Sequence, residues 1–309
     1  MSRAADQAID LAFAAGWGLV RSAPPAVAAG AFRAVADLAH RRGGPGVQRL
    51  RANLARVAPD AGPAELDLLV RDGMRSYARY WCEAFRLPSM DHGDINRRTH
   101  VVGREHAVEA MTSGNGLIFA VPHSGNYDAS GVFVVETLRE LGLEPVFTTV
   151  VERLRPESVY RRFVGYRESL GFEVLTAGDG SAVYRGLTAR LKAGGVVCLV
   201  SDRDLTATGT AVSLFGRTAR MPTGPARLAA MTGATLLPAF PSFRGDGWGL
   251  PMGPPIPVPD RAAVPKATQA LADVFTGWIR SAPAEWHMLQ PIFSEDLGAA
   301  GAGADAAAS

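Results

Sequence analysis

Residues 117–128 read LIFAVPHSGNYD and are the most informative stretch of the sequence. Five apolar residues, 117–121, form the kind of short run that is typical of a buried strand. His123 follows the run, and Gly125 allows the chain to turn before the next helix. In α/β proteins, functional sites form at the carboxyl ends of strands. The segment therefore predicts a strand, a turn and a helix, with a histidine placed where a site would form.

The pattern beyond this segment alternates between short β runs and amphipathic helices. Strands are predicted at 117–121, 145–151, 172–176, 196–201, 212–214 and 235–240, and helices at 128–141, 158–170, 182–192, 224–232 and 268–280. This alternation is typical of an α/β fold with crossover helices. We expect a central mixed β-sheet flanked by helices.

The first 88 residues have a different, helical pattern. Apolar residues recur at helical spacing over 9–20, 25–39, 46–57 and 64–85, with breaks at Pro and Gly clusters between them. We therefore expect a helical N-terminal layer over 1–88, an α/β core over 89–296, and a Gly/Ala tail over 297–309. The tail has too few side chains to offset its ordering entropy, so we expect it to be disordered.

Aromatic residues in the fourth of these helices, Tyr77, Tyr80, Trp81 and Phe85, recur at helical spacing. They are typical of a packed stripe in a protein core. A groove that binds an acyl chain would use similar residues, so both interpretations stay open.

The composition is typical of a globular protein with free cysteines and without a zinc site. The chain has 309 residues, 47% of them hydrophobic, which suffices for a globular core. Cys82 and Cys198 lie in apolar contexts and are expected to be buried free thiols. No Cys/His cluster has the spacing of zinc ligands, so we expect no metal.

Charge and hydropathy favour a protein that lies on a membrane surface. Residues 1–56 hold eight arginines, no lysine and three aspartates, a net charge of +5 where the whole chain has +2. The sequence contains no run of about 20 apolar residues, which is the length needed to span a bilayer. The apolar segment at 8–20 is predicted to be an amphipathic helix, in the core or on the surface of an anionic membrane. Asp6 and Asp10 argue against a signal peptide.

His123 is the first candidate catalytic residue, and Asp128 is the candidate that orients it. A neutral imidazole can take a proton from an alcohol while a carboxylate holds its other nitrogen. The alternative is a histidine that merely caps the following helix. The nucleophile motif G-x-S-x-G is absent, which favours direct attack by a substrate hydroxyl. Amides near Gly125 and Asn126 are candidate donors to an oxyanion.

A second polar cluster follows the apolar run at 196–200. Asp202 and Arg203 would lie at the same edge of the sheet as His123, either in contact with substrate or within a local ion-pair network. Glu152 and Arg167 follow another predicted strand. Arginines there would suit phosphate recognition, although surface helices often carry arginines.

Four segments together resemble the bacterial lysophospholipid acyltransferase superfamily. They are Pro122–Asp128, Ser201–Leu205, Phe215-Gly216 with Pro222–Pro225, and Trp286–Pro291. The resemblance covers about residues 5–296 and is to the branch of lipid A acyltransferases and phosphatidylinositol mannoside acyltransferases.

The resemblance implies a glycerol-phosphate-acyltransferase-like fold and an enzyme that needs no metal or cofactor. It gives His123 the role of base and Asp128 that of the orienting carboxylate. Asp202 matches an acidic position that holds the acceptor or orients the base, with Arg203 beside it. Glu152 and Arg167 match positions that contact sugar or phosphate.

We therefore expect a peripheral O-acyltransferase on the cytoplasmic face of the cell membrane. It would move a long-chain acyl group from acyl-CoA to a sugar hydroxyl of a phosphatidylinositol mannoside-type glycolipid. Its partners would be acyl-CoA, the glycolipid and an anionic membrane surface, with no nucleic acid. The alternatives are a lipid A-type acyltransferase that uses an acyl-carrier thioester, a thioesterase or esterase, and a non-catalytic lipid-binding protein.

Overall fold

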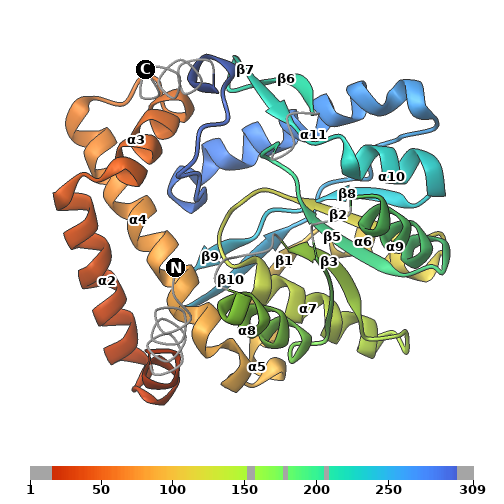
Figure 1. Ribbon diagram of the computed structural model, residues 1–309, viewed down its shortest axis with the longest axis horizontal. Helices are drawn as coiled ribbons and strands as arrows, with labels where there is room; N and C mark the ends of the chain where they lie inside the picture. Colours follow the sequence, from red (N-terminus) through yellow and green to blue (C-terminus); the bar gives the residue numbers. More distant parts are fainter. Residues whose placement is uncertain (1–15, 152–156, 177–179, 205–208, 298–309) are drawn as a thin grey trace.

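The computed structural model describes residues 16–151, 157–176, 180–204 and 209–297. Its centre is a five-stranded sheet in the order β4-β3-β5-β2-β8 (Figure 1). The strands are β2 (Leu117–Val121), β3 (Phe147–Val151), β4 (Phe172–Thr176), β5 (Val196–Val200) and β8 (Thr235–Pro238). All neighbours in this sheet pair in parallel. The α/β class is thus confirmed, but the expectation of a mixed central sheet is wrong.

Helices cover both faces of this sheet. They are α6 (Arg104–Thr112), α7 (Tyr127–Glu140), α8 (Glu157–Glu168), α9 (Gly180–Lys192), α10 (Gly224–Thr232) and α11 (Val264–Ser281). Strand β2 shows how the two faces differ, because successive side chains point to opposite sides. Leu117, Phe119 and Val121 pack in a cluster with residues of α6 and α7. Ile118 and Ala120 pack instead with residues of α9, α10 and α11. Since both faces are covered, the strand is apolar throughout.

Antiparallel pairing occurs, within the described residues, in two smaller sheets. One has the order β1-β10-β9, with β1 (Thr99–Val102), β9 (Ser242–Arg244) and β10 (Gly247–Pro251). The other is the hairpin of β6 (Thr210–Leu214) and β7 (Arg217–Met221). The strand expected at 212–214 therefore exists but lies outside the central sheet, because a tight turn at Phe215-Gly216 pairs it with its sequence neighbour.

Three of the four expected N-terminal helices agree with the structure to within a few residues, whereas the helix expected at 9–20 lies mostly outside the described residues. They are α2 (Pro25–Arg42), α3 (Pro45–Val57) and α4 (Pro63–Arg86), followed by the 3-10 turn η1 (Leu87–Ser89) and α5 (His92–Arg98). Each of the first three has proline in its first turn, where a missing N–H costs nothing. Figure 1 shows α2 to α4 together at one side of the molecule.

These helices are joined to residues 283–296, the last long segment that the structure describes. Asn53 of α3 donates hydrogen bonds to the carbonyls of Met288 and Gln290, at 2.7 and 3.0 Å. Arg56 makes a two-fold contact with Asp296. The remaining 3-10 turns are η2 (Arg261–Ala263) and η3 (Pro283–Glu285). Through these contacts the last segment, 283–296, lies between the helical layer and the core.

Three other expectations from the sequence can be compared with the structure. The aromatic stripe of α4 packs against Trp17 and Phe163, with ring centroids 5.1 to 5.8 Å apart. Cys82 and Cys198 are free thiols, and only Cys82 is fully buried. Within the described ranges, no helix has the length and apolar character needed to cross a membrane. The expected tail beyond 297 lies outside the described residues.

Candidate active site

The parallel pairing of β2 and β5 brings two polar segments together. Val121 and Val200 are register partners at the carboxyl ends of the two strands. One residue further, the Ser201 amide donates to the Val121 carbonyl at 2.8 Å. His123 and Asp202 follow these residues at the same edge of the sheet. Residues 79 positions apart in the sequence are thereby placed in direct contact.

His123 and Asp202 form a hydrogen-bonded pair. The imidazole Nδ1 lies 2.6 Å from Asp202 Oδ1, and the backbone N–H of His123 donates to Oδ2 at 3.0 Å. Asp202 is 0% exposed, whereas the His123 side chain is 38% exposed. With Nδ1 held by the carboxylate, Nε2 is the ring nitrogen that remains for a substrate. This is the arrangement of a general base with its orienting acid.

The electrostatics of the pair suit such a base. Burial by itself would lower the pKa of His123, but the charge of Asp202 and its hydrogen bond outweigh burial and raise the pKa above its ordinary 6.5. Burial works to raise the pKa of Asp202, but His123 and the hydrogen bonds from Trp286 and the backbone lower it overall. The contact therefore favours the ionised form of Asp202 and the protonated form of His123.

Asp128 does not contact His123 in the way that the sequence suggested. Its Oδ1 accepts from Arg167 Nε at 2.9 Å, and its Oδ2 accepts from the Tyr80 hydroxyl at 3.2 Å. Asp128 is 2% exposed, in the first turn of α7, and its side chain lies between α7, α4 and α8. The nitrogen expected to face Asp128 is held by Asp202 instead. The structure thus corrects the role of Asp128 and gives Arg167 a carboxylate partner inside the protein.

His123 is not the cap of α7. The side chain of Asn126 takes that role and accepts from the Ala129 amide at 2.9 Å. The amide of Gly125 donates to the Glu285 carbonyl at 3.1 Å. Of the amides expected to serve an oxyanion, that of Gly125 is therefore already in use.

The loop between β2 and α7 is packed closely against the start of β9. Gly125 has φ of +48°, and a Cβ there would lie 2.5 Å from the backbone of Ser242. Ser124 is buried, and its hydroxyl donates to the Pro241 carbonyl at 2.8 Å. Glycine is needed at 125 both for the backbone conformation and for the close approach.

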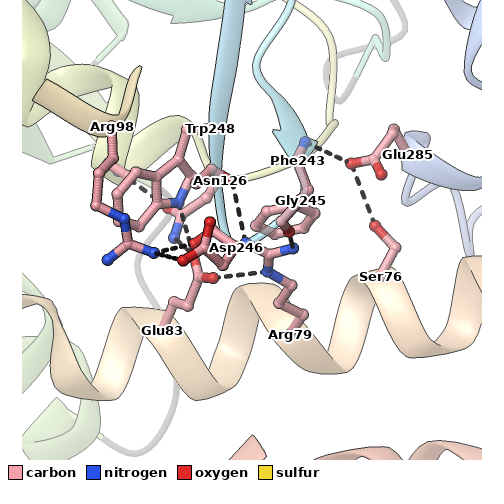
Figure 2. Close-up of polar contacts among 12 residues, drawn as sticks. Ser76, Arg79, Glu83, Arg98, Asn126, Phe243, Gly245, Asp246, Trp248 and Glu285 are labelled. Atoms are coloured by element: carbon pink, nitrogen blue, oxygen red, sulfur yellow. Dashed lines mark hydrogen bonds and ion pairs between the residues drawn. The ribbon is translucent and has the colours of Figure 1, made fainter. Parts of the chain in front are cut away.

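Helix α4 supports the same loop from the other side (Figure 2). Glu83 Oε2 accepts from Asn126 Nδ2 and from Trp248 Nε1, each at 2.8 Å. Arg79 donates to Glu83 and to the carbonyls of Gly245 and Gly247. One helix of the N-terminal layer thus holds both the cap of α7 and the turn between β9 and β10.

Segment 283–296 contributes residues to which the sequence analysis gave no role at the site. The Glu285 carboxyl accepts from the Phe243 amide at 3.0 Å and from Ser76 at 3.4 Å, and Ser76 Oγ lies 2.8 Å from His287 Nε2. Burial raises the pKa of Glu285 to about 7. Burial also lowers the pKa of His287 to about 3, so this second imidazole is neutral. The available signal was the Trp286–Pro291 segment, which carries the family resemblance.

Arg203 and Glu152 complete the list of sequence candidates. Arg203 is partly buried beside Asp202, and its charge lowers the pKa of His123 slightly against the effect of Asp202. Glu152 lies outside the described residues.

Two cavities lie near the site. A cavity of about 860 Å³ lies between α2, α4 and the β9–β10 turn, and Ser76 and Glu285 line its inner wall. A smaller apolar pocket of about 20 Å³ is lined by Val121, Tyr127 and Gly131, among others. The smaller pocket follows the end of β2 that carries His123.

Known proteins resemble this chain over nearly its whole length. The profile of the bacterial lipid A biosynthesis acyltransferase family matches residues 2–295. A phosphatidylinositol mannoside acyltransferase of Mycolicibacterium smegmatis is 49% identical over 293 residues, which cover 94% of this chain and 93% of that protein. A protein of the same description from Mycobacterium tuberculosis is 46% identical over 295 residues, covering 94% and 90%. The matched regions include both His123 and Asp202.

Proposed function

We propose that this chain, which belongs to the bacterial lipid A biosynthesis acyltransferase family and is an acyltransferase, acylates a glycolipid of the phosphatidylinositol mannoside type. A sugar hydroxyl of the glycolipid is the acceptor, and acyl-CoA is the donor. The names of the two mycobacterial relatives support the acceptor class. The observation that carries the chemistry is the hydrogen-bonded pair of His123 and Asp202.

The reaction proceeds by direct attack of the acceptor. His123 Nε2 takes the proton of the sugar hydroxyl while that oxygen attacks the thioester carbonyl carbon. The tetrahedral intermediate then expels the CoA sulfur, which takes the proton back from the imidazolium. Asp202 holds the imidazole and stabilises its charged form. Ser124, the hydroxyl next to the base, is buried and bonded to Pro241, which supports a mechanism without a covalent serine intermediate.

The acyl chain binds in the apolar pocket next to the end of β2. In the structure this pocket has a volume of about 20 Å³, room for about one water molecule. Side chains along its wall, such as Val134 and Phe147, must therefore move when a long chain enters.

The exposed face of α2 docks on the membrane. Val27, Val35 and Leu38 are exposed on this helix, and Arg41 and Arg42 are exposed at its end. Apolar and cationic side chains on one helix suit insertion at the surface of an anionic bilayer. This supports a peripheral enzyme. Binding to anionic vesicles in a sedimentation assay, weakened by salt, is the expected result, and no binding at any salt concentration would contradict it.

A transfer assay tests the function itself. The purified protein is incubated with labelled palmitoyl-CoA and extracted membrane lipids, and the products are identified by mass spectrometry. An acylated phosphatidylinositol mannoside is expected. His123→Ala is expected to lower the transfer rate by about 10²- to 10⁴-fold, because it removes the base. Near-normal transfer by that variant would overturn the mechanism.

The same assay separates the alternatives. A thioesterase would release free fatty acid faster than acylated lipid even with a good acceptor present. A lipid A-type enzyme would transfer from an acyl-carrier thioester and not from acyl-CoA. A non-catalytic protein would bind lipid and be indifferent to the change at His123.

A further inference from the structure

We propose that Trp286 is a positioning residue, which fixes the Asp202 carboxylate against the His123 imidazole. This inference rests on the proposed role of His123 as the base. Trp286 lies in the last segment of the chain, 84 residues from Asp202. It touches neither of the reacting substrates in the mechanism above and acts through Asp202.

The two oxygens of Asp202 have separate partners. Oδ1 faces His123 Nδ1 at 2.6 Å, whereas Oδ2 accepts from the His123 backbone at 3.0 Å and from Trp286 Nε1 at 2.9 Å. Rotation of the carboxylate would break all three contacts. The indole bond therefore helps to set which oxygen meets the imidazole and in which plane.

Bulk water does not reach the contact between the indole and Asp202. Asp202 and Trp286 are both 0% exposed. A buried acceptor that loses its donor stays without it, and a charged acceptor loses more than a neutral one. Loss of the hydrogen bond between Trp286 and Asp202 should therefore affect the site more than loss of a hydrogen bond at the protein surface.

Trp286 is itself held by the loop that carries His123. Ser124 and Trp286 form an antiparallel bridge. On one side of it the His287 amide donates to the His123 carbonyl at 2.8 Å, and on the other the Gly125 amide donates to the Glu285 carbonyl at 3.1 Å. The backbone of the base and the backbone of Trp286 are thus tied together. The hydrogen bond from the indole therefore fixes the Asp202 carboxylate relative to the same backbone that carries His123.

Trp248 offers a matched control. It is 1% exposed, and its Nε1 also donates to a carboxylate, that of Glu83, at 2.8 Å (Figure 2). Glu83 contacts Asn126 and Arg79 and makes no described contact with His123. Trp286→Phe and Trp248→Phe therefore remove the same chemical bond from two different carboxylates.

The two variants are compared by the pH dependence of kcat/KM. Without the indole donor, the charge of Asp202 is shared with fewer partners and stabilises the imidazolium more strongly. Trp286→Phe should therefore move the acid limb of the profile to higher pH. It should also lower kcat by about tenfold, the worth of one hydrogen bond to a charged group, with KM unchanged. Trp248→Phe should leave the acid limb in place.

A second measurement does not depend on the variant folding. In the wild-type protein, the indole N–H resonance of Trp286 is assigned by its nuclear Overhauser contacts with Phe215, whose ring centroid lies 5.4 Å away. This resonance should shift with the same midpoint as the acid limb, and that of Trp248 should not. A Trp286 resonance that stays constant across this range would overturn the proposal.

The outcomes separate this inference from the proposed mechanism. Activity retained by His123→Ala would overturn both. An inactive His123→Ala, together with a folded Trp286→Phe that has the wild-type profile, would overturn only the role of Trp286. A fall in kcat without a shift of the acid limb would also overturn it, because that result would report on packing alone.

Discussion

Two buried aspartates lie near the ends of neighbouring strands, and each binds a different kind of side chain. Asp202 follows β5 and holds the imidazole of His123. Asp128 lies beyond β2, five residues from His123, and holds the guanidinium of Arg167. The residue closer in sequence is thus not the partner of the base. The pairing of parallel strands, rather than sequence spacing, selects the carboxylate that orients the histidine.

The partners give the two carboxylates different chemistry. An imidazole gains and loses a proton near neutral pH, so the pair of His123 and Asp202 can take part in proton transfer. A guanidinium stays protonated in proteins, and the charge of Asp128 raises the pKa of Arg167 further despite its burial. We therefore expect the pair of Asp128 and Arg167 to act on the structure around the site and not on proton transfer. Substitutions at each pair test this difference.

Asp202→Asn should have the largest effect. The amide cannot stabilise the imidazolium and can hold the wrong tautomer, so kcat should fall by about 10²- to 10⁴-fold in steady-state transfer assays. Asp204→Asn is a matched control, because this buried carboxylate accepts from the Gly209 amide at 2.7 Å and not from His123. If Asp202→Asn keeps more than a tenth of wild-type kcat, the two pairs do not differ in the way described above.

Asp128→Asn should act on stability. It leaves the Arg167 side chain, which is 14% exposed, as an unpaired buried charge. The cost is expected to be about 3–5 kcal/mol in the free energy of unfolding, measured with urea. The double variant Asp128→Asn/Arg167→Met removes both charges and should recover most of this loss. No recovery would show that the ion pair is not what the single change disrupts.

The pH profile sharpens the comparison further. The base works when it is neutral, so wild-type kcat/KM should fall as pH drops through the pKa of His123, which Asp202 raises above 6.5. Without that carboxylate, burial alone lowers the pKa, so Asp202→Asn should move the acid limb to lower pH. Asp128→Asn should leave it unmoved. Equal shifts in the two variants would remove the distinction.

Tyr80→Phe should have the smallest effect. The hydroxyl lies 3.2 Å from Asp128 and 2.5 Å from the Tyr127 hydroxyl. Its loss should cost about 1.5–3 kcal/mol in the free energy of unfolding, the usual contribution of a hydrogen bond to a charged group. The acid limb should not change. A tenfold fall in kcat would instead show that Tyr80 and Asp128 affect the catalytic base.

Much of the fold could be predicted from local pattern. The run at 117–121 and the helices α2, α3 and α4 follow from apolar spacing and from Pro and Gly breaks, and their bounds agree with the structure to within a few residues. Strands β1, β7, β9 and β10 were not predicted. They are short, and β10 begins Gly-Trp-Gly, a sequence with weak strand propensity that is held in place by its neighbours.

The sequence by itself determined the class of fold and the position of the candidate base, because a continuous apolar run followed by His123 and Gly125 specifies a buried strand, its end and a turn. The resemblance carried by four short segments gave the enzyme family. Only the tertiary structure decided which carboxylate faces that base. Asp128, Asp202 and Trp286 are distributed over three segments, and their relation to His123 depends on strand order and on the path of the last segment. Contacts between residues about 80 positions apart leave no periodicity in the chain that would reveal them.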